Sequence, residues 1–368
     1  MRLLFVVHTE ASLGWGGQEI RVLSEMAGMM ARGHRMLLLC PREARIFDEA
    51  ARRGVPAEAL AIGRKRVTAA QALRRRLRAL APDLVVTHSS TDSWLAALAT
   101  RFWRGAPPIV RIRHISAPVG RNAATRWLYR DAAAHVVTTG ERLRDDLVRD
   151  LGLAPGHATS VPTGIDLARY APRDLAAARR ELGLPEAGHV TGIAATLRSW
   201  KGHRYLLEAW AGLSRGADDR LLVVGDGPGR ENLKRQAAEL GITDAVVMPG
   251  NQADVAPWLA AMDVFVLPSY ANEGVPQAIM QAMAMGLPVL STPVGSIPEI
   301  VTDGETGLLV PPLDVDALRA GLRRLAEDPA LRTRLGSAAL ARARERFADG
   351  RMLDAMEVVF RNAIATSR

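Results

Sequence analysis

The sequence predicts an α/β protein built from two doubly wound domains, each with a parallel sheet. Short apolar runs, typical of strands buried on both faces, alternate with amphipathic helical stretches along the chain. The alternation restarts after residues 161–172, VPTGIDLARYAP, whose proline and glycine are typical of a hinge. We therefore expect a first domain over residues 1–168, a second over residues 169–348, and a final helix over residues 349–368.

The chain begins with a strand, a glycine-rich turn and a helix. The predicted strand covers residues 2–7, and the helix covers residues 19–32, followed by another strand at 36–40. Gly16 and Gly17 lie just ahead of the helix, where the lack of a side chain lets backbone amides approach a phosphate. A plain tight turn explains this pair of glycines equally well.

A basic helix and several strands complete the first domain. Within residues 62–82, Leu73, Leu77 and Leu80 share one helical face and arginines cover the rest. This pattern fits a solvated surface helix, or a face that meets anionic lipid headgroups. The remaining predicted elements are strands at 83–87, 109–112 and 136–138 and helices at 93–100 and 141–151.

One histidine of the first domain is placed where ligands bind. His114 follows the buried strand 109–112, at the end of a strand that faces the expected inter-domain cleft. A histidine in such a position can serve in binding or catalysis, although a histidine satisfied by hydrogen bonds in the core is the alternative.

The second domain repeats the strand-turn-helix pattern. After a strand at 190–195, Arg198 and Lys201 lie in the turn before a helix, from which cations can reach a diphosphate. Lys201 is one of only three lysines in the chain, which favours a functional role over a compositional one. Gly227 lies in the turn GDGPGR after a strand at 221–225; its G-x-G-x-G spacing is a weak nucleotide signal. A further strand is expected at 246–250.

The most informative stretch runs from residue 261 to residue 301. An apolar strand leads into a turn with the single carboxylate Glu273, then Gly274, Val275 and Pro276. Pro276 suits the first position of the helix 277–285, because its fixed φ matches and its missing N–H costs nothing there. The amides of Gly274 and Val275 would face an anion at the start of this helix.

The C-terminal part is predicted to be helical. Asp314 and Asp316 resemble a metal-binding Asp-x-Asp, but Asp314 is better explained as the N-cap of an amphipathic helix at 315–327. Glu299, in the turn ahead of residues 303–312, could bond a ribose or cap the helix that includes Ile300. The last helix, 349–364, has an apolar face formed by Met352, Met356, Val359 and Ala363.

Several motifs together resemble a known family. Glu-Gly-x-Pro, a helix of small residues, Gly-x-Pro-Val and Gly-x-x-Pro-Glu, all within residues 261–301, are similar to the donor-binding segment of family 4 glycosyltransferases. The resemblance covers nearly the whole chain and is strongest over residues 190–312. It implies the GT-B fold: two Rossmann-like domains facing a central cleft, with the C-terminal helix packing back on the N-terminal domain.

The resemblance also implies roles for individual residues. Glu273 would bind the donor sugar and His114 would lie near the reacting centre, while Gly16 and Gly17 would lie near the donor phosphates. Arg198 and Lys201 would bind the diphosphate, although the family places its arginine further ahead of the lysine, and Gly227 would lie near the nucleotide. The family's second glutamate, eight positions after the first, is replaced here by Gln281, whose amide can still bond a ribose hydroxyl.

Charge is unevenly distributed along the chain. Residues 1–170 carry 26 Lys+Arg and 15 Asp+Glu, hence +11, whereas residues 171–368 carry 22 and 24, hence −2. We therefore expect an anionic partner for the first half, through peripheral contact with an anionic membrane. Nucleic acid is not expected, because no stacking surface of aromatic and basic residues is evident. An arginine-rich composition explains the abundance of arginine but not this asymmetry.

Other features restrict the compartment and the chemistry. A single cysteine, Cys40, indicates a reducing compartment, and neither a signal segment nor an apolar run of transmembrane length is evident. We expect a cytoplasmic protein, associated with the inner face of the cytoplasmic membrane. The sequence contains no GxSxG, HExxH, CxxC or GxxxxGK[ST] motif, and we expect neither a cofactor nor a metal requirement.

The resemblance implies a retaining glycosyltransferase of the hexosyltransferase type. It would move a sugar from a nucleotide diphosphate sugar, with UDP as the expected nucleotide, to a hydroxyl of a membrane-associated glycan or lipid-linked acceptor. The stretches NEGVPQAIMQAMAMG and LRSWKGH are most similar to enzymes of lipopolysaccharide or envelope polysaccharide assembly. Two alternatives stay open: a nucleotide-sugar epimerase of the same fold, and a non-catalytic protein that binds sugar nucleotides.

Overall fold

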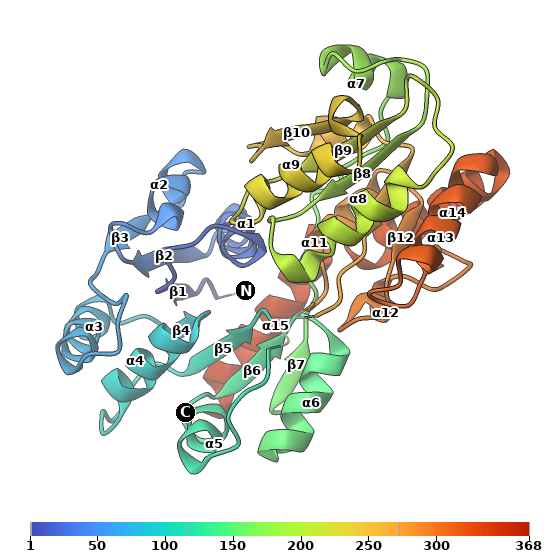
Figure 1. The fold of residues 1–368 in the computed structure, drawn as a ribbon. Coiled ribbons are helices and arrows are strands. Elements are labelled where there is room, and N and C mark those ends of the chain that lie inside the picture. The colour runs from blue at the N-terminus through green and yellow to red at the C-terminus, as the bar shows by residue number, and fades with distance from the viewer. Residues whose placement is uncertain (1, 116, 272, 368) are drawn as a thin grey trace. The chain divides into compact units, whose positions relative to one another are not determined.

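The computed structural model describes residues 2–115, 117–271 and 273–367. It divides into two compact units: unit 1 is the chain up to Gly164 together with the segment from Asp349 onward, and unit 2 is Ile165–Ala348. Each unit contains its own parallel sheet flanked by helices (Figure 1). The doubly wound α/β fold predicted from the sequence is therefore confirmed.

Unit 1 contains a parallel sheet of seven strands within the described residues, in the order β3-β2-β1-β4-β5-β6-β7. Its strands are β1 (Phe5–Thr9), β2 (Arg35–Cys40), β3 (Ala57–Ala59), β4 (Leu84–Thr87), β5 (Ile109–Arg113), β6 (His135–Thr138) and β7 (Ala158–Ser160). Its helices are α1 (Gly17–Ala31), α2 (Arg45–Arg52), α3 (Val67–Leu80), α4 (Ser90–Thr100), α5 (Ala123–Arg130), α6 (Glu141–Leu151) and α15 (Asp349–Thr366).

Both faces of this sheet are covered because successive side chains of a strand point to opposite faces. Val6 belongs to a core cluster with residues of α1 and α15, whereas the next residue, Val7, belongs to a cluster with residues of α3 and α4. The apolar runs of the sequence therefore pack on both faces at once, as expected for a parallel sheet.

Unit 2 has a parallel sheet of six strands within the described residues, in the order β10-β9-β8-β11-β12-β13. Its strands are β8 (Val190–Ala194), β9 (Arg220–Val224), β10 (Val246–Gly250), β11 (Val264–Leu267), β12 (Val289–Ser291) and β13 (Gly307–Leu309). Its helices are α7 (Leu175–Glu181), α8 (His203–Ala211), α9 (Arg230–Glu239), α10 (Ala256–Ala260), α11 (Gln277–Ala284), α12 (Ile297–Ile300), α13 (Val315–Glu327) and α14 (Pro329–Arg346), with short 3₁₀ turns η1 (Ser199–Lys201) and η2 (Thr243–Ala245).

Each sheet contains one point at which the strand order reverses. In unit 1 the chain proceeds outward from β1 to β3 and then returns to place β4 beside β1. In unit 2 it proceeds outward from β8 to β10 and then places β11 beside β8. Ligands of open α/β sheets bind outside the carboxyl ends of the strands at such a reversal. The residues that follow these strands are therefore the natural site candidates in each unit.

The C-terminal helix packs on unit 1, as predicted. Met352, Met356, Val359 and Ala363 are buried in the core cluster that also contains residues of α1 and β1. The guanidinium of Arg21, on α1, lies within 3.8 Å of the Met356 sulfur and donates to the carbonyl of Val161 at 2.7 Å. Because α15 fills one face of the sheet, it is an integral part of unit 1.

Some predicted elements were misplaced or missed. The first strand was predicted at residues 2–7, but β1 runs from Phe5 to Thr9, so His8 belongs to the strand and not to the following loop. The polar side chain of Thr9 can be buried at the end of this strand because its Oγ1 donates a hydrogen bond to an Asp92 carboxylate oxygen at 3.0 Å. The long helix α14 was not predicted, because its buried stripe includes Ala339 and Ala343 and is only weakly apolar.

Candidate functional site

The carboxylate Glu273 lies in the turn between β11 and α11, and it is 3% exposed. One of its oxygens, Oε1, accepts a hydrogen bond from Ser269 Oγ at 2.5 Å and lies 2.7 Å from Lys201 Nζ. Ser269 follows β11, whereas Lys201 belongs to the turn after β8. Because β8 and β11 are neighbours at the strand-order reversal, the fold brings together two predicted site residues 72 positions apart.

The turn after β8 is fixed against the acidic turn by its backbone. The carbonyl of Trp200 accepts a hydrogen bond from the Tyr270 amide at 2.9 Å. Arg198 is the exposed N-cap of η1, and its guanidinium lies 5.7 Å from the centre of the Trp200 ring. His203, the first residue of α8, lies in the core. Burial, with a smaller effect of Lys201, lowers the pKa of His203 to about 4. Lys201 is therefore held against Glu273, while Arg198 is open to solvent.

The glycine turn after β9 packs on the same loop. Gly227 has φ +158°, and a Cβ at this position would lie 2.9 Å from the Leu197 amide nitrogen. The Leu197 amide donates to the Asp226 carbonyl, and the Gly229 amide donates to the Leu197 carbonyl, both at 3.0 Å. Close packing against Leu197 is therefore enough to explain why residue 227 is glycine. The turn that contains Gly227 lies beside the loop that carries Arg198 and Lys201.

The predicted donor-binding residues around α11 differ in one detail from expectation. Pro276 was predicted as the first helical residue, but it is the N-cap, with φ −71° and an extended ψ of 118°. The fixed φ of proline is compatible with either position, so the sequence alone could not separate them. Gly274 is half-buried, Val275 is buried, and Gln281 is half-buried within α11.

Glu299 was predicted in a turn, where it could bond a ribose or cap the helix that includes Ile300. That helix is present as the short helix α12, and Glu299 lies inside it, in the first turn. The ribose contact stays a prediction. Asp314, in contrast, is the N-cap of α13 and accepts from the Ala317 amide at 2.9 Å, as predicted.

In unit 1, the predicted glycines lie at the N-terminus of α1. Gly16 is the N-cap residue with an extended backbone at φ −172°, and Gly17 begins the helix. A Cβ on Gly16 would approach nothing closer than a Glu19 carboxylate oxygen at 3.8 Å. The fold of unit 1 therefore does not require glycine at position 16.

Among the buried carboxylates beside this turn, Glu10 and Asp92 have raised pKa values. Glu10 follows β1 and accepts hydrogen bonds from the Ser12 amide at 2.8 Å and the Gln18 side chain at 2.5 Å. Burial, and then repulsion by Asp92, raise the pKa of Glu10 to about 8. Burial also raises the pKa of Asp92, which caps α4 together with Ser89. This pair was not predicted from the sequence, although Glu10 follows β1 and Asp92 lies in the first turn of α4, after β4.

His114 is half-buried after β5 and bonds to a second histidine. His114 Nε2 lies 3.1 Å from His88 Nδ1, and His88 Nε2 lies 3.0 Å from His8 Nδ1. These three rings come from the ends of β1, β4 and β5, which are adjacent strands. Sequence analysis selected only His114; the available signal was that all three histidines lie at or just after the carboxyl end of a predicted strand.

Both halves of this chain match models of known protein families. Residues 15–169 match the family model "Glycosyltransferase Family 4", and residues 188–328 match "Glycosyl transferases group 1". The D-inositol 3-phosphate glycosyltransferase of Saccharomonospora viridis is 33% identical over 315 residues, 78% of this chain and 71% of that protein. The chain belongs to glycosyltransferase family 4.

Further comparisons agree with membership of family 4. A second D-inositol 3-phosphate glycosyltransferase, from Streptomyces avermitilis, is 35% identical over 70% of this chain; the match spans 60% of that protein's length. HepE from Anabaena, solved in complex with UDP and glucose, has the same fold, with a TM-score of 0.84 at 21% identity and coverage of 97% of this chain and 99% of that one. The expected GT-B fold class of family 4 is therefore confirmed.

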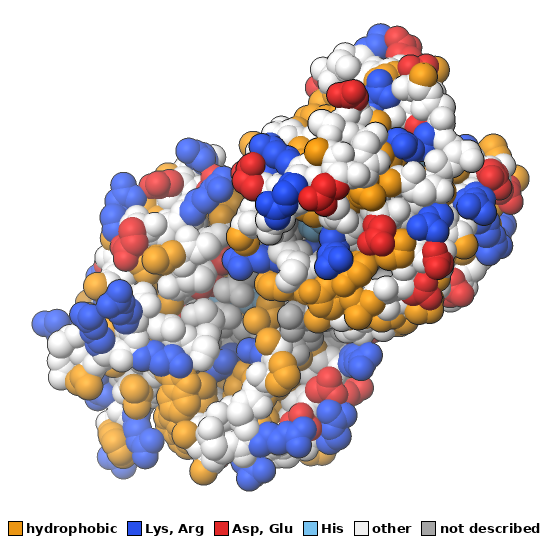
Figure 2. All heavy atoms as spheres, viewed as in Figure 1, with side chains coloured by type: hydrophobic (Ala, Val, Ile, Leu, Met, Phe, Trp, Pro, Cys, Tyr) orange, Lys and Arg blue, Asp and Glu red, His pale blue; other side chains and the backbone are white. Residues whose placement is uncertain are grey.

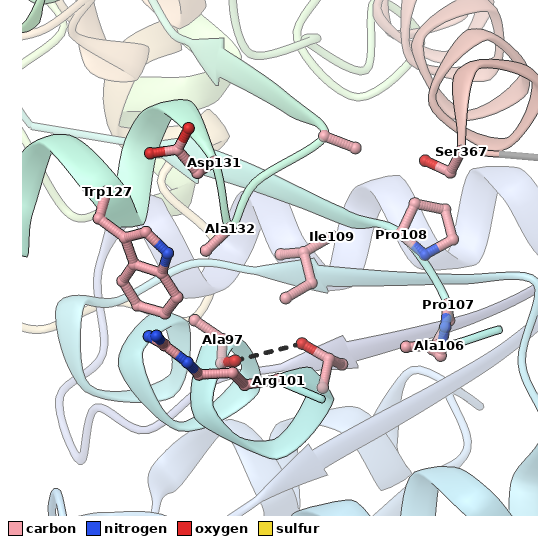
Figure 3. Close-up of a pocket in the computed structure, with 12 residues that line it drawn as sticks. Ala97, Arg101, Ala106, Pro107, Pro108, Ile109, Trp127, Asp131, Ala132 and Ser367 are labelled. Carbon is pink, nitrogen blue, oxygen red and sulfur yellow. Dashed lines mark hydrogen bonds between the residues drawn. The ribbon is translucent and has the colours of Figure 1, made fainter. Parts of the chain in front are cut away.

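A separate cavity of about 470 Å³ lies at the amino ends of the unit 1 strands, whereas the candidate site residues follow their carboxyl ends. It is lined by Arg101, Pro108, Ile109, Trp127 and other residues near the amino ends of β5 and β6 (Figure 3). None of the residues predicted to bind the donor of a family 4 enzyme lines it. Among the described residues, no group of three or more His, Cys, Asp or Glu side chains has an arrangement that could hold a metal ion.

Proposed function

We propose that the chain is a retaining glycosyltransferase that uses a nucleotide diphosphate sugar as donor. The observation that supports this most directly is the Glu273–Lys201 ion pair at the strand-order reversal of unit 2. A carboxylate suits the hydroxyls of a sugar, and an ammonium suits the phosphate to which that sugar is joined. An anionic residue and a cationic residue 2.7 Å apart therefore match two adjacent groups of one donor.

The remaining predicted residues complete this proposal. Arg198 and Lys201 offset the charge that builds on the diphosphate as the sugar departs, so that no metal is required. Gln281 bonds the ribose, the Gly274 and Val275 amides contact sugar or phosphate, and Gly227 lies near the nucleotide. Gly16 and Gly17 approach the donor phosphates, and His114 contacts the donor sugar.

The proposed reaction proceeds with retention at the anomeric carbon. The bond between that carbon and the phosphate oxygen breaks, and a new bond forms to the acceptor oxygen on the same face of the sugar. The departing phosphate takes the acceptor's proton, so the products are a nucleoside diphosphate and a glycoside. This route requires no nucleophile–acid pair of carboxylates of the kind that retaining hydrolases use.

UDP is the nucleotide that we propose. HepE, which shares the fold, binds UDP. The experiment that tests the donor is a thermal-shift screen of UDP, GDP, ADP and their sugar conjugates without added metal, because a ligand that binds only the folded state stabilises it. At a concentration about 100 times its Kd, the donor should add about 2.7 kcal/mol to the free energy of unfolding. No shift with any nucleotide would contradict the proposal.

A second step separates the transferase from its two alternatives. The donor identified by the screen is incubated with and without acceptors, and the products are followed by NMR. A transferase forms a glycoside that retains the donor's anomeric configuration, only when an acceptor is present. An epimerase converts the sugar nucleotide with no acceptor, and a non-catalytic protein leaves it unchanged. The rate in EDTA should equal the rate without it.

The acceptor that we propose is a membrane-associated glycan or lipid of the cell envelope. The relatives named above act, by their names, on D-inositol 3-phosphate, which makes a small phosphorylated polyol the second candidate. Both acceptor types should therefore be offered in the transfer assay. Transfer to the soluble polyol alone would replace the lipid-linked acceptor in this proposal.

A basic and aromatic surface of unit 1, which was not evident in the sequence, supports the membrane contact. We define it as Arg74, Arg78, Arg101, Phe102 and Trp103, from α3 and the turn after α4. Phe102 is 90% exposed and is held at φ +59°. The Arg74 and Arg78 guanidiniums lie 5.9 and 5.2 Å from the centre of the Trp103 ring. Arg74 also donates to the Arg101 carbonyl at 2.8 Å, which holds the turn in place.

This surface fits an anionic bilayer because an aromatic side chain is surrounded by cations. Figure 2 shows basic and apolar side chains gathered over α3 and α4, with few acidic ones on that face. Among the described residues, no helix combines the length and apolar character that crossing a bilayer requires. The proposed contact is therefore peripheral and lies at the headgroups.

Sedimentation with vesicles tests the membrane contact. The protein should sediment with vesicles that contain anionic lipid and not with zwitterionic vesicles, and Phe102→Ser with Arg101→Ala should lower the partition coefficient about tenfold, since each cation near the surface contributes about 1 kcal/mol. Arg149→Ala, on helix α6, is the matched control. Equal binding of the two variants would exclude the basic and aromatic surface as the contact.

A further inference from the structure

The three histidines of unit 1 form one hydrogen-bonded chain. His8 and His88 are buried, at 0% and 5% exposure, and their rings are nearly parallel, with 5.2 Å between centroids and a 15° tilt. The His88 and His114 rings follow at 5.3 Å. The chain thus leads from a ring packed against Phe360 of α15 to a half-buried ring after β5.

The position of the middle ring is fixed by the start of α4. The His88 amide donates to Asp92 Oδ2 at 2.8 Å, and the same oxygen accepts from Thr9 Oγ1. Asp92 therefore links the ends of β1 and β4, the two strands that carry His8 and His88. This connection holds the inner two rings at bonding distance regardless of any ligand.

The two hydrogen bonds that join the three histidines can be arranged in only two directions. Burial lowers the pKa of all three imidazoles, which are therefore neutral at pH 7 and carry one N–H each. Because His88 uses both nitrogens, it donates at one and accepts at the other, so both hydrogen bonds must run the same way. Either His8 donates outward toward His114, or His114 donates inward toward His8.

One direction is favoured by the inner end of the chain. His8 Nε2 is buried and has no hydrogen-bond partner among the residues that the structure describes. If the histidine hydrogen bonds ran inward, His8 Nε2 would carry a hydrogen that has no acceptor. Buried N–H groups without an acceptor are rarer in native proteins than acceptors without a donor. If the chain runs outward, the atom holds only a lone pair. The hydrogen of His114 then resides on Nδ1.

We propose that His8 and His88 are positioning residues that fix the ring orientation and tautomer of His114, so that His114 keeps Nε2 bonded inside the chain and offers an Nδ1–H donor. The ligand atom that this donor suits is an uncharged or anionic oxygen, such as a sugar hydroxyl or ring oxygen. This step rests on the proposed function, in which His114 contacts the donor sugar. The tautomer itself rests only on the contacts within unit 1.

Two-bond ¹H–¹⁵N correlation NMR of the full chain, with ¹⁵N-labelled histidine, reads each tautomer directly. The His114 signals, assigned by loss in His114→Gln, should show hydrogen on Nδ1 at pH 7. His88→Ala removes the donor to Nε2, so the His114 signals should change to a tautomer mixture. Hydrogen on Nε2 of His114 in the parent, or signals unchanged in His88→Ala, would overturn the proposal.

Two further variants separate positioning from folding. His88→Asn places an amide where Nδ1 was, so it should still donate to His114 and preserve the tautomer. His135→Gln is the matched control: His135 is half-buried, bonds Thr159 Oγ1 at 2.9 Å and lies near another histidine, outside the chain of three. It should leave the His114 signals unchanged. Thermal melting of each variant confirms that it is folded.

Kinetics with the donor identified above complete the test. His88→Ala should lower kcat about 10- to 100-fold while changing the donor KM less than about threefold, because a misplaced group acts mainly on the transition state. His88→Asn should recover most of that loss. An unchanged kcat in His88→Ala, with the tautomer altered, would overturn the positioning role. If the parent protein transfers no sugar, the proposed function fails, while the NMR result still decides the tautomer.

Discussion

Each sheet has a buried glutamate near its strand-order reversal, and the two glutamates differ in how their charge is dealt with: one is neutral and the other is paired with a cation. Glu10, in unit 1, lies with Ser12, Gln18 and Asp92, and burial raises its pKa to about 8, so it is mostly protonated at pH 7. Glu273, in unit 2, has Lys201 at 2.7 Å and forms an ion pair. The strand-order reversal therefore carries a neutral site after the first strand of unit 1, β1, and a charged site after the returning strand of unit 2, β11.

This difference fits the roles that the proposed function gives to the two units. A buried carboxyl must either be neutralised or be paired with a cation, since an isolated charge in the interior is costly. The charged alternative in unit 2 suits a diphosphate donor, whose own charges need partners. The neutral alternative in unit 1, with its protonated carboxyl and neutral histidines, suits uncharged hydroxyls. Four substitutions test this comparison.

The largest effect is expected from Glu273→Gln, which keeps the shape of the side chain but removes its charge. The amide cannot hold Lys201 as an ion pair, so kcat/KM for the donor should fall about 10²- to 10³-fold in the transfer assay. Glu239→Gln is the control, because Glu239 is two-thirds exposed at the end of α9. Activity of Glu273→Gln within threefold of the parent would remove the ion pair from the mechanism.

The next largest effect is expected from Gly295→Ala, which tests how the charged site is built. Gly295 has φ +59°, and a Cβ there would lie 1.9 Å from the Glu273 carbonyl oxygen. The substitution should lower the free energy of unfolding by about 2–4 kcal/mol, measured by urea denaturation. Gly304→Ala is the control: its φ is +73° but nothing lies within 4 Å, so its loss should be about 1 kcal/mol. Equal losses would mean that backbone conformation alone requires glycine at position 295.

The sequence predicted the fold because apolar runs and turns report on parallel sheets directly. The strands around β5, β8, β10 and β11 were placed within a few residues, and the apolar face of α15 was identified residue by residue. The helices α2 and α7 were missed because they span only eight and seven residues, and α14 was missed because its buried stripe is rich in alanine. The turn that carries Glu273 and the loop that carries Lys201 were also located from the sequence.

What the sequence could not show is which side chains meet. Nothing in the spacing of Glu273 and Lys201 specifies a 2.7 Å contact; that depends on the order of β8 and β11 in the sheet. The same holds for His8, His88 and His114, which come together because β1, β4 and β5 are adjacent. Phe102 was not selected either, since a single exposed aromatic residue has no pattern in sequence. The assigned donor and acceptor roles remain predictions.

A smaller effect is expected from Glu10→Gln, which tests the neutral site. Because the pKa of Glu10 is raised from its ordinary 4.5 to about 8, the unfolded chain loses this proton first as pH rises. The contribution of Glu10 to stability is therefore full below pH 4.5 and is lost as pH rises through 8. Glu10→Gln cannot titrate, so urea unfolding between pH 5 and 8.5 should show a shallower loss of stability with pH than in the parent. Parallel pH profiles of parent and variant would mean that Glu10 is ionised in the folded protein, and the contrast with Glu273 would disappear.

The smallest structural effect is expected from Gly16→Ala. This substitution tests whether Gly16 and Gly17 contact the donor phosphates or only form a tight turn. Gly16 has an extended backbone, and an added methyl would meet only a Glu19 oxygen at 3.8 Å, so the melting temperature should change by less than about 1 °C. If its backbone approaches the donor phosphates, the methyl should raise the donor KM about tenfold. Gly14→Ala, in the same loop and with open space around it, should alter neither quantity. Equal donor KM values for the two variants would favour the plain tight turn, and would leave donor binding to the charged site of unit 2.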